Sequence, residues 1–190
     1  MMLALEKIRN KYKINDDTLV VGNVGRLTNG KNHIFMLDVF AEVCKSQSAI
    51  MIFIGEGNLR KVIENHVKEL ELEKKVILLG MQNNVNEWLQ VMDVFFFHSE
   101  HEGLPISLIE AQISGLPCVV SENITKEVEI TPLCDFVSLQ APIQKWKEHI
   151  VDKFRHIRKS FGAEIYSSGY SISHEAKRVK EIYYDITRRH

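Results

Sequence analysis

The stretch LVVGNVGRLTNGKN, residues 19–32, joins an apolar run to a polar loop and then to the start of a helical segment. An apolar run without alternating polar residues is typical of a parallel strand that is buried on both faces. A helix from Asn32 to about Lys45 and a second apolar run from Ala49 to Ile54 follow it. Strand, helix and strand at this spacing predict a right-handed βαβ unit.

The same alternation continues along the chain. Further strands are expected at Val76–Gly80, Val94–Phe97, Cys118–Val120 and Leu133–Leu139, and further helices at Leu59–Leu70, Asn84–Gln90, Pro105 to Gly115, Ile143–Arg158 and Ser173–Ile186. This order predicts a single α/β domain over residues 1–190, a Rossmann-like three-layer sandwich with a mostly parallel six-stranded sheet. Ligands of such sheets bind beyond the carboxyl ends of the strands, so the loops there are the first candidates for a site.

Composition and charge narrow the class of protein. The chain has 24 Lys and Arg against 25 Asp and Glu, which argues against nucleic-acid binding driven by charge. The excess of basic residues from Lys145 to His190 favours a solvated helix face over a membrane-surface or partner-docking role.

The expected location is cytoplasmic, with contact at the inner face of the membrane through that basic region as the alternative. No apolar run reaches the ~18 residues of a membrane span, and Glu6 comes too early for a signal peptide. The cysteines Cys44, Cys118 and Cys134 are odd in number and lie in apolar runs, which favours thiols in a reducing compartment.

Two loops combine glycines with basic residues. After the first strand, Gly25 is followed by Arg26 and then by Lys31, and two cations at the mouth of a sheet suit a diphosphate, although solvated loop cations are an equal alternative. After the second strand, Gly55 and Gly57 match the first glycines of a dinucleotide fingerprint, but Arg60 stands in the third place. That pair indicates either a tight turn or a backbone that a phosphate or sugar approaches closely.

The most informative motif is EGLPISLIE, residues 102–110. Glu102 precedes a helix whose free N–H groups, near Gly103 to Ile106, form an anion site, and Glu110 falls in the second turn, where a carboxylate can accept hydrogen bonds from a ribose diol. Glu110 is either a surface helix glutamate or, because its neighbours place it within an apolar helix, an acid that needs a partner. His98 and His101, which border the loop, are interpreted as polar loop residues in preference to catalytic bases.

These motifs together resemble the donor-binding domain of retaining glycosyltransferases of family 4, which have the two-domain GT-B fold. Two glutamates with seven residues between them are that family's signature, and the stretch from Glu102 to Gln112 looks like members from capsular and exopolysaccharide clusters. The resemblance implies a transferase that uses a nucleoside diphosphate sugar, with UDP favoured, and a polysaccharide or lipid-linked acceptor.

The resemblance also implies roles for individual residues. Arg26 and Lys31 would stabilise the departing diphosphate, Glu110 would bind the ribose, and Glu102 would lie near the donor sugar. The backbone of Gly25, of Gly55 and Gly57, and of Gly103 and Leu104 would border the donor, and the backbone around Val76, Leu78 and Gly80 would contact the base. Because no Asp-any-Asp triplet occurs, no metal site and no cofactor are expected.

Family members carry an acceptor-binding domain before the donor domain. We therefore expect this chain to be a fragment that is inactive alone, with a separate acceptor-domain subunit as the alternative. The helix around Glu175 to Ile186 resembles the one that crosses to that domain. Two competing functions stay open: a non-catalytic binding or interaction module, and a nicotinamide-dependent oxidoreductase, which only Gly55 and Gly57 and the strand-turn-helix pattern favour.

Overall fold

The computed structural model describes residues 2–170 and residue 180. Six strands form one sheet in the order β3-β2-β1-β4-β5-β6, and all neighbouring strands are parallel. The strands are β1 (Leu19–Val24), β2 (Ala49–Ile54), β3 (Val76–Gly80), β4 (Val94–Phe97), β5 (Cys118–Ser121) and β6 (Cys134–Val137). The predicted Rossmann-like α/β class is confirmed, and every predicted strand is present.

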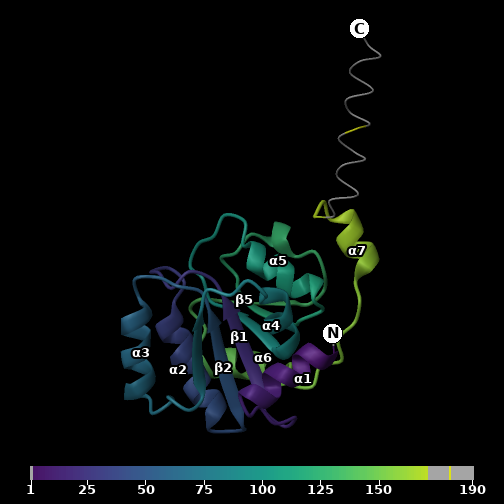
Figure 1. Ribbon diagram of the computed structural model, residues 1–190. Helices are drawn as coiled ribbons and strands as arrows, with labels where there is room; N and C mark the ends of the chain where they lie inside the picture. The colour runs from purple at the N-terminus through teal and green to yellow at the C-terminus, as the bar shows by residue number, and fades with distance from the viewer. Residues whose placement is uncertain (1, 171–179, 181–190) are drawn as a thin grey trace.

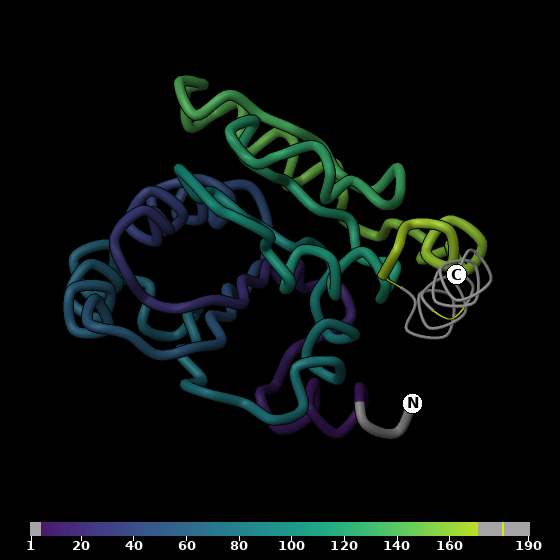
Figure 2. Tube along the Cα trace, turned by 90° about the horizontal axis from the view of Figure 1, so that it is seen from above, coloured from purple at the N-terminus to yellow at the C-terminus, as the bar shows by residue number. Residues whose placement is uncertain are grey.

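Helices cover both faces of this sheet (Figures 1 and 2). They are α1 (Met2–Lys11), α2 (His33–Cys44), α3 (Arg60–Glu69), α4 (Val85–Val91), α5 (Ile106–Ile113), α6 (Ile143–Asp152) and α7 (Gly162–Ser167), with a short 3-10 helix at Lys126–Val128. Side chains of α2, α3 and α6 form one apolar core, and side chains of α1, α4 and α5 contribute to the other. The three layers that the alternation predicts are therefore present.

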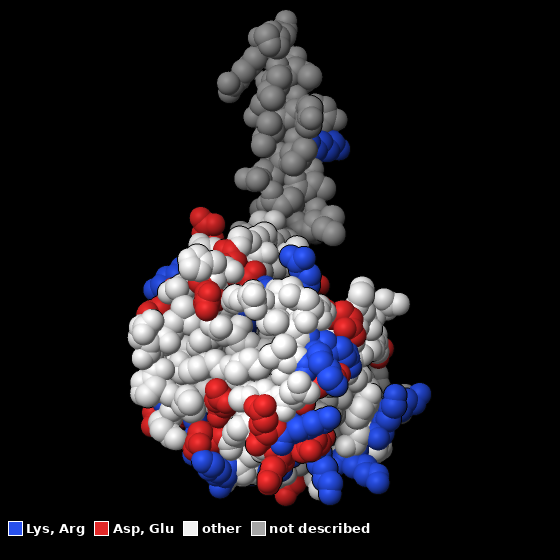
Figure 3. Space-filling view, turned by 90° about the vertical axis from the view of Figure 1, so that its left-hand side faces the viewer, with Lys and Arg blue, Asp and Glu red and all other residues white. Residues whose placement is uncertain are grey.

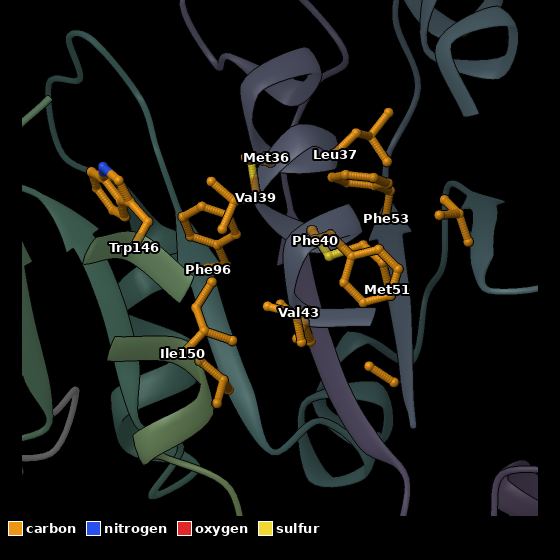
Figure 4. Packing of buried hydrophobic residues seen from close by; sticks show 14 of the residues in the cluster. Met36, Leu37, Val39, Phe40, Val43, Met51, Phe53, Phe96, Trp146 and Ile150 are labelled. Atoms are coloured by element: carbon orange, nitrogen blue, oxygen red, sulfur yellow. The ribbon is translucent and has the colours of Figure 1, made fainter. Parts of the chain in front are cut away.

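The phenylalanines of β4 show how one strand supplies both cores. Phe96 faces α2 and α6, and its ring centre lies 5.5 Å from that of Trp146 (Figure 4). Phe95 and Phe97 point to the opposite face and stack on each other with ring centres 5.9 Å apart. Successive side chains of a strand alternate between faces, so a run without polar residues fits only a strand that is covered twice.

The carboxyl-terminal region departs from the sequence prediction. The helix predicted at Ile143–Arg158 ends at Asp152, and Arg155 takes a left-handed backbone conformation with φ of 63°. This turn brings Arg158 against the rest of the domain, where its guanidinium donates to the carbonyls of Leu89 and Ser114 at 2.7 and 2.9 Å. The helix predicted at Ser173–Ile186 lies outside the described residues, and the sequence did not predict α7 or the 3-10 helix.

Two surface features bear on the earlier expectations. No helix in residues 2–170 is long and apolar enough to cross a membrane. On the face shown in Figure 3, basic and acidic side chains are interspersed toward the lower half. Much of the basic region from Lys145 to His190 lies outside the described residues, so its surface role stays a prediction.

Candidate functional site

Three loops meet at the carboxyl edge of the sheet, as the strand order predicts. The N–H of Gly25 donates to the carbonyl of Ile54 at 2.9 Å, and the N–H of Gly55 donates to the carbonyl of Gly80 at 2.9 Å. The turn after β2 also holds the loop after β1, because the N–H of Leu27 donates to Glu56 at 3.0 Å. These backbone contacts fix the loops after β1, β2 and β3 against one another.

The glycines after β2 have a structural reason. Gly55 has a φ of 141°, and a Cβ there would lie 2.0 Å from the carbonyl oxygen of Gly25. A Cβ at Gly57 would lie 2.2 Å from the carbonyl oxygen of Leu27. Of the two interpretations that the sequence leaves open, the close packing of two turns accounts for both glycines. Gly55 still borders the pocket described next.

A pocket of about 390 Å³ opens between these loops. Its lining combines the end of β1 and the start of its loop with the turn after β2 and the segment between β3 and α4. The lining residues are Val24, Gly25, Arg26, Ile54, Gly55, Glu56, Met81, Gln82 and Val85. Sequence reasoning stopped at Gly80 and missed Met81 and Gln82, although both directly follow the end of a strand.

Residues predicted along β3 do not all lie at this pocket. Gly80 lies at the carboxyl end of the strand, where it pairs with Ile54, whereas Val76 pairs with Met51 at the amino end. Four residue steps along the strand separate the two, or about 13 Å. The carbonyl of Leu78 accepts a hydrogen bond from Arg60 at 3.3 Å. Only the Gly80 end of the predicted base-contacting stretch therefore reaches the mouth.

Arg60 also explains why the dinucleotide fingerprint is incomplete. Its guanidinium pairs with Glu56 at 2.7 Å and with Glu64 at 3.0 Å, in addition to the bond to Leu78. It lies at the first residue of α3, where the fingerprint needs a glycine for close contact between helix and strand. The turn after β2 therefore lacks the form that a dinucleotide-binding turn requires.

The loops after β1 and β4 contact each other through two predicted residues. The ammonium of Lys31 forms an ion pair with the carboxylate of Glu102, and it lies 5.3 Å from the centre of the Phe97 ring. The two charged side chains are 22% and 15% exposed. The N–H of Glu100 donates to the carbonyl of Gly30 at 2.8 Å, which adds a backbone bond between the same loops. A cation and an acid from distant parts of the sequence are thus held together at a partly exposed position.

Arg26 has a different environment. It is exposed on the rim of the pocket, and its side chain has no hydrogen bond or ion pair with any described residue. The structure places Lys31 in a defined contact and leaves the guanidinium of Arg26 free to meet a ligand.

The loop after β4 leads into α5, and the start of this helix has unused donors. Pro105 precedes the helix and caps it with no side chain. The N–H groups of Gly103, Leu104 and Ile106 donate to no described acceptor. Gly103 and Leu104 are exposed, and no atom outside the immediate chain lies within 4 Å of a Cβ built at Gly103. Free N–H groups at a helix start carry partial positive charge and attract anions.

Of the two environments considered for Glu110, the structure shows the surface of the helix. Glu110 is exposed, and it shares its helix face with Ile106 and Ile113, which are 62% and 47% exposed. Residues at this helical spacing point the same way, and the apolar contacts of α5 are made by the other face, through Leu108 and Ala111. The carboxylate of Glu110 has no partner among the described residues and remains available to a ligand.

The polar group that α5 does bury is Gln112, which the sequence analysis missed. Gln112 is 0% exposed, donates to the carbonyl of Val128 at 2.7 Å and accepts from the N–H groups of Ile130 and Thr131, each at 3.1 Å. These bonds tie α5 to the segment after β5. An amide can both donate and accept, so Gln112 satisfies its own polar atoms while it fixes the helix.

The two histidines that border the loop differ from each other. His101 is exposed, whereas His98 is 3% exposed and packs against Phe35 and Trp146 with ring centres 4.1 and 4.5 Å apart. Burial lowers the pKa of His98 to about 4, so its imidazole is neutral at pH 7. His98 is a loop residue, as predicted, but it directly follows β4 and is buried in the core against Phe35 of α2 and Trp146 of α6.

Comparison with known proteins matches the part of the chain that contains these loops. The family model for glycosyl transferases group 1 matches residues 5–131, which include the loops after β1, β2, β3 and β4. The chain belongs to the glycosyl transferases group 1. The family resemblance that the motifs indicated is confirmed.

Relatives of this group 1 chain include other proteins named as glycosyltransferases. EpsF of Bacillus subtilis, a provisionally assigned glycosyltransferase, is 37% identical over 70% of this chain and 35% of its own length. The UDP-Gal:alpha-D-GlcNAc-diphosphoundecaprenol alpha-1,3-galactosyltransferase of Escherichia coli is 25% identical over 90% of this chain and 46% of its own length. The chain thus spans less than half of these relatives.

A solved structure shows the same fold. Anabaena HepE in complex with UDP and glucose superposes with a TM-score of 0.69 at 20% identity, over 81% of this chain and 43% of the HepE chain. The described residues therefore have the fold of part of the HepE chain.

Proposed function

We propose that this chain is the donor-binding part of a retaining glycosyltransferase that takes a sugar from UDP-sugar. The observation that carries the proposal is the contact between Lys31 and Glu102 beside the uncapped start of α5. Fixed positive charge at this place favours the diphosphate and stabilises the negative charge that develops as it departs. The complex of HepE with UDP and glucose and the UDP-Gal named for the Escherichia coli relative support the choice of donor.

Each part of the donor has a candidate contact. Arg26, Lys31 and the N–H groups of Gly103 and Leu104 bind the diphosphate, and Glu110 binds the ribose from the exposed face of α5. Glu102 lies at the end of this arrangement and contacts the donor sugar. The base enters the pocket that Met81 and Gln82 border, near the backbone of Gly80.

Binding of the donor requires Lys31 to change partners, at least in part. In the free protein its ammonium pairs with the carboxylate of Glu102. A diphosphate that approaches Lys31 also approaches this carboxylate, and like charges repel. Glu102→Gln should therefore bind UDP at least as tightly as the unmodified chain, whereas Lys31→Ala should bind it more weakly.

The acceptor and the second half of the cleft belong to the proposal as well. The acceptor is a polysaccharide or a lipid-linked sugar, and an acceptor-binding domain or subunit supplies the opposite wall. The chain alone then transfers sugar slowly or not at all, because catalysis requires both reactants in one aligned site. The site uses cations and N–H groups in place of a metal ion, so donor binding needs no divalent cation.

Titration calorimetry with UDP in EDTA tests the proposal. Charged hydrogen bonds contribute about 1.5–3 kcal/mol, so Arg26→Ala and Lys31→Ala should each weaken binding about tenfold or more. Lys74→Ala, which removes an exposed cation between α3 and β3, is the matched control and should leave the affinity unchanged. Absence of UDP binding, or binding of NADH in its place, would refute the proposed donor, and loss of UDP binding in EDTA would refute metal independence.

A further inference from the structure

A second pocket, of about 430 Å³, opens between the start of α2 and the loops after β4, β5 and β6. Its rim carries the amide side chains of Asn32, Asn123 and Gln140, and we call it the amide pocket. It shares no lining residue with the pocket that Met81 borders. The roles proposed above for the donor leave it unused.

The wall of the amide pocket contains two rings. Phe35 and His98 lie side by side with their ring planes 31° apart, and Trp146 and Phe96 contact His98 from the core. Neither ring nitrogen of His98 has a hydrogen-bond partner among the described residues. A buried polar group without a partner costs free energy, which a ligand hydroxyl could recover after a small side-chain movement.

An unpaired buried imidazole alone does not mark a binding site. His33 is 1% exposed, has no partner for either ring nitrogen and has a similarly lowered pKa of about 4, yet it borders neither pocket described here. What distinguishes His98 is its place in the wall of a cavity that has polar groups on its rim. His33 therefore serves as an internal control for His98.

The rim favours a neutral ligand with several hydroxyl groups. Asn123 and Gln140 are exposed, and their amides have no side-chain hydrogen bond with described residues. The carboxylate of Glu100 accepts from the amide of Asn32 at 3.1 Å and keeps further acceptor capacity. No Lys or Arg is among the described residues that line the pocket, so a phosphate or carboxylate would meet Glu100 without a compensating cation.

We propose that the amide pocket binds a neutral pyranose unit of the acceptor glycan. Amides and a carboxylate exchange hydrogen bonds with hydroxyls, and the rings of the wall pack against the C–H face of a sugar. Asn32 directly follows Lys31 and His101 directly precedes Glu102, so the pocket adjoins the place proposed for the donor sugar. The assignment to the acceptor rests on the proposed function, whereas binding of a neutral sugar does not.

Nitrogen–proton correlation spectra of the full chain, titrated with methyl glucoside, methyl galactoside and methyl N-acetylglucosaminide, test this proposal. At least one glycoside should produce saturable shifts at His101, Asn123 and Gln140 and in the imidazole of His98, but not in that of His33. Asn123→Ala and Gln140→Ala should each raise its dissociation constant about fivefold, the loss expected for one neutral hydrogen bond. Asn65→Ala, which removes an exposed amide from α3, should not change it.

A charged ligand adds a second test. Methyl glucuronide keeps the ring of methyl glucoside and adds a carboxylate, so it should bind more weakly, and Glu100→Gln should reduce the difference. Absence of saturable shifts, shifts confined to Met81 and Gln82, or tighter binding of the glucuronide would overturn the proposal. If the chain binds a glycoside but not UDP, the assignment of the amide pocket to the acceptor is wrong. If it binds UDP but no glycoside, the amide pocket does not bind a sugar, and the proposed function stands.

Discussion

The turn after β2 and the loop after β4 look alike in sequence and differ in structure. Both place glycine between a strand and a helix at the carboxyl edge of the sheet. The backbone of the loop after β1 packs directly on Gly55 and Gly57, whereas Gly103 has open space where a side chain would begin. A glycine therefore marks close packing in one loop and free access in the other, and only the surroundings of its Cα distinguish the two cases.

The largest expected effect of a single substitution is on the closed turn, the turn after β2. Gly55→Ala should destabilise the chain by about 3 kcal/mol or more, because it combines an unfavourable φ with a Cβ 2.0 Å from a backbone oxygen. In a domain of this size, that loss lowers the Tm by roughly 6–12 °C. Gly30→Ala distinguishes backbone strain from steric contact, because Gly30 has a φ of 82° but no atom lies within 4 Å of a Cβ built there. This substitution should destabilise the chain by only about 1 kcal/mol. Equal thermal melts for the two variants would contradict the packing argument.

Lowering the pH should reduce the stability of the chain through two buried histidines, His33 and His98. Burial lowers the pKa of His98, and burial together with Lys31 lowers the pKa of His33, in each case to about 4. Between pH 6.5 and 4 the unfolded chain binds protons that the folded chain does not, so stability falls as the pH falls through this window. Urea unfolding should show a loss of about 2 kcal/mol for each histidine. A His33→Gln, His98→Gln double variant should have a flatter pH profile, and an unchanged slope would show that other groups are responsible.

The next effect concerns Glu110 on the open side. If its carboxylate accepts hydrogen bonds from both ribose hydroxyls, Glu110→Ala should weaken UDP binding at least tenfold and hardly change the binding of 2′,3′-dideoxy-UDP. Lys31→Ala should weaken both ligands alike, because they share the diphosphate. Calorimetry gives the dissociation constants of UDP and 2′,3′-dideoxy-UDP for the unmodified chain and for each variant, which together form a double-mutant cycle. Equal losses for both ligands on Glu110→Ala would show that Glu110 does not contact the ribose.

The sequence predicted the fold well because its signals are local. The phenylalanine run of β4 and the apolar runs of β1 and β2 indicate strands covered on both faces, and the parallel order follows from the helices between them. The end of α6 was missed because it depends on Arg158, whose partners lie in α4 and after α5. A contact between residues so far apart leaves no periodic signal in the chain.

Only part of the site was predicted, because contacts between residues far apart in the sequence leave no local signal. The spacing of Glu102 and Glu110 and the cations after β1 were recognisable as motifs. The exposure of Glu110 was left open, because its apolar neighbours in sequence fall on different faces of α5, and Ile106 and Ile113 point outward with it. Gln112 was not predicted, because no feature of the neighbouring sequence indicates that its amide forms hydrogen bonds with the segment after β5.

The smallest expected effect is at Gly103, and it completes the comparison with Gly55. Gly103 lacks a positive φ and has no atom within 4 Å of a built Cβ, so Gly103→Ala should change the free energy of unfolding by less than about 0.5 kcal/mol. Alanine keeps the N–H group that is proposed to bind the diphosphate, and UDP affinity should fall less than threefold by calorimetry. Gly103→Pro removes this N–H group. Because a hydrogen bond to a charged group contributes about 1.5 kcal/mol, a further loss of UDP affinity of about tenfold would show that the backbone N–H of residue 103 binds the diphosphate. A large loss of stability in Gly103→Ala would instead mean that the loop after β4 is packed as tightly as the turn after β2, and the distinction between the two loops would fail.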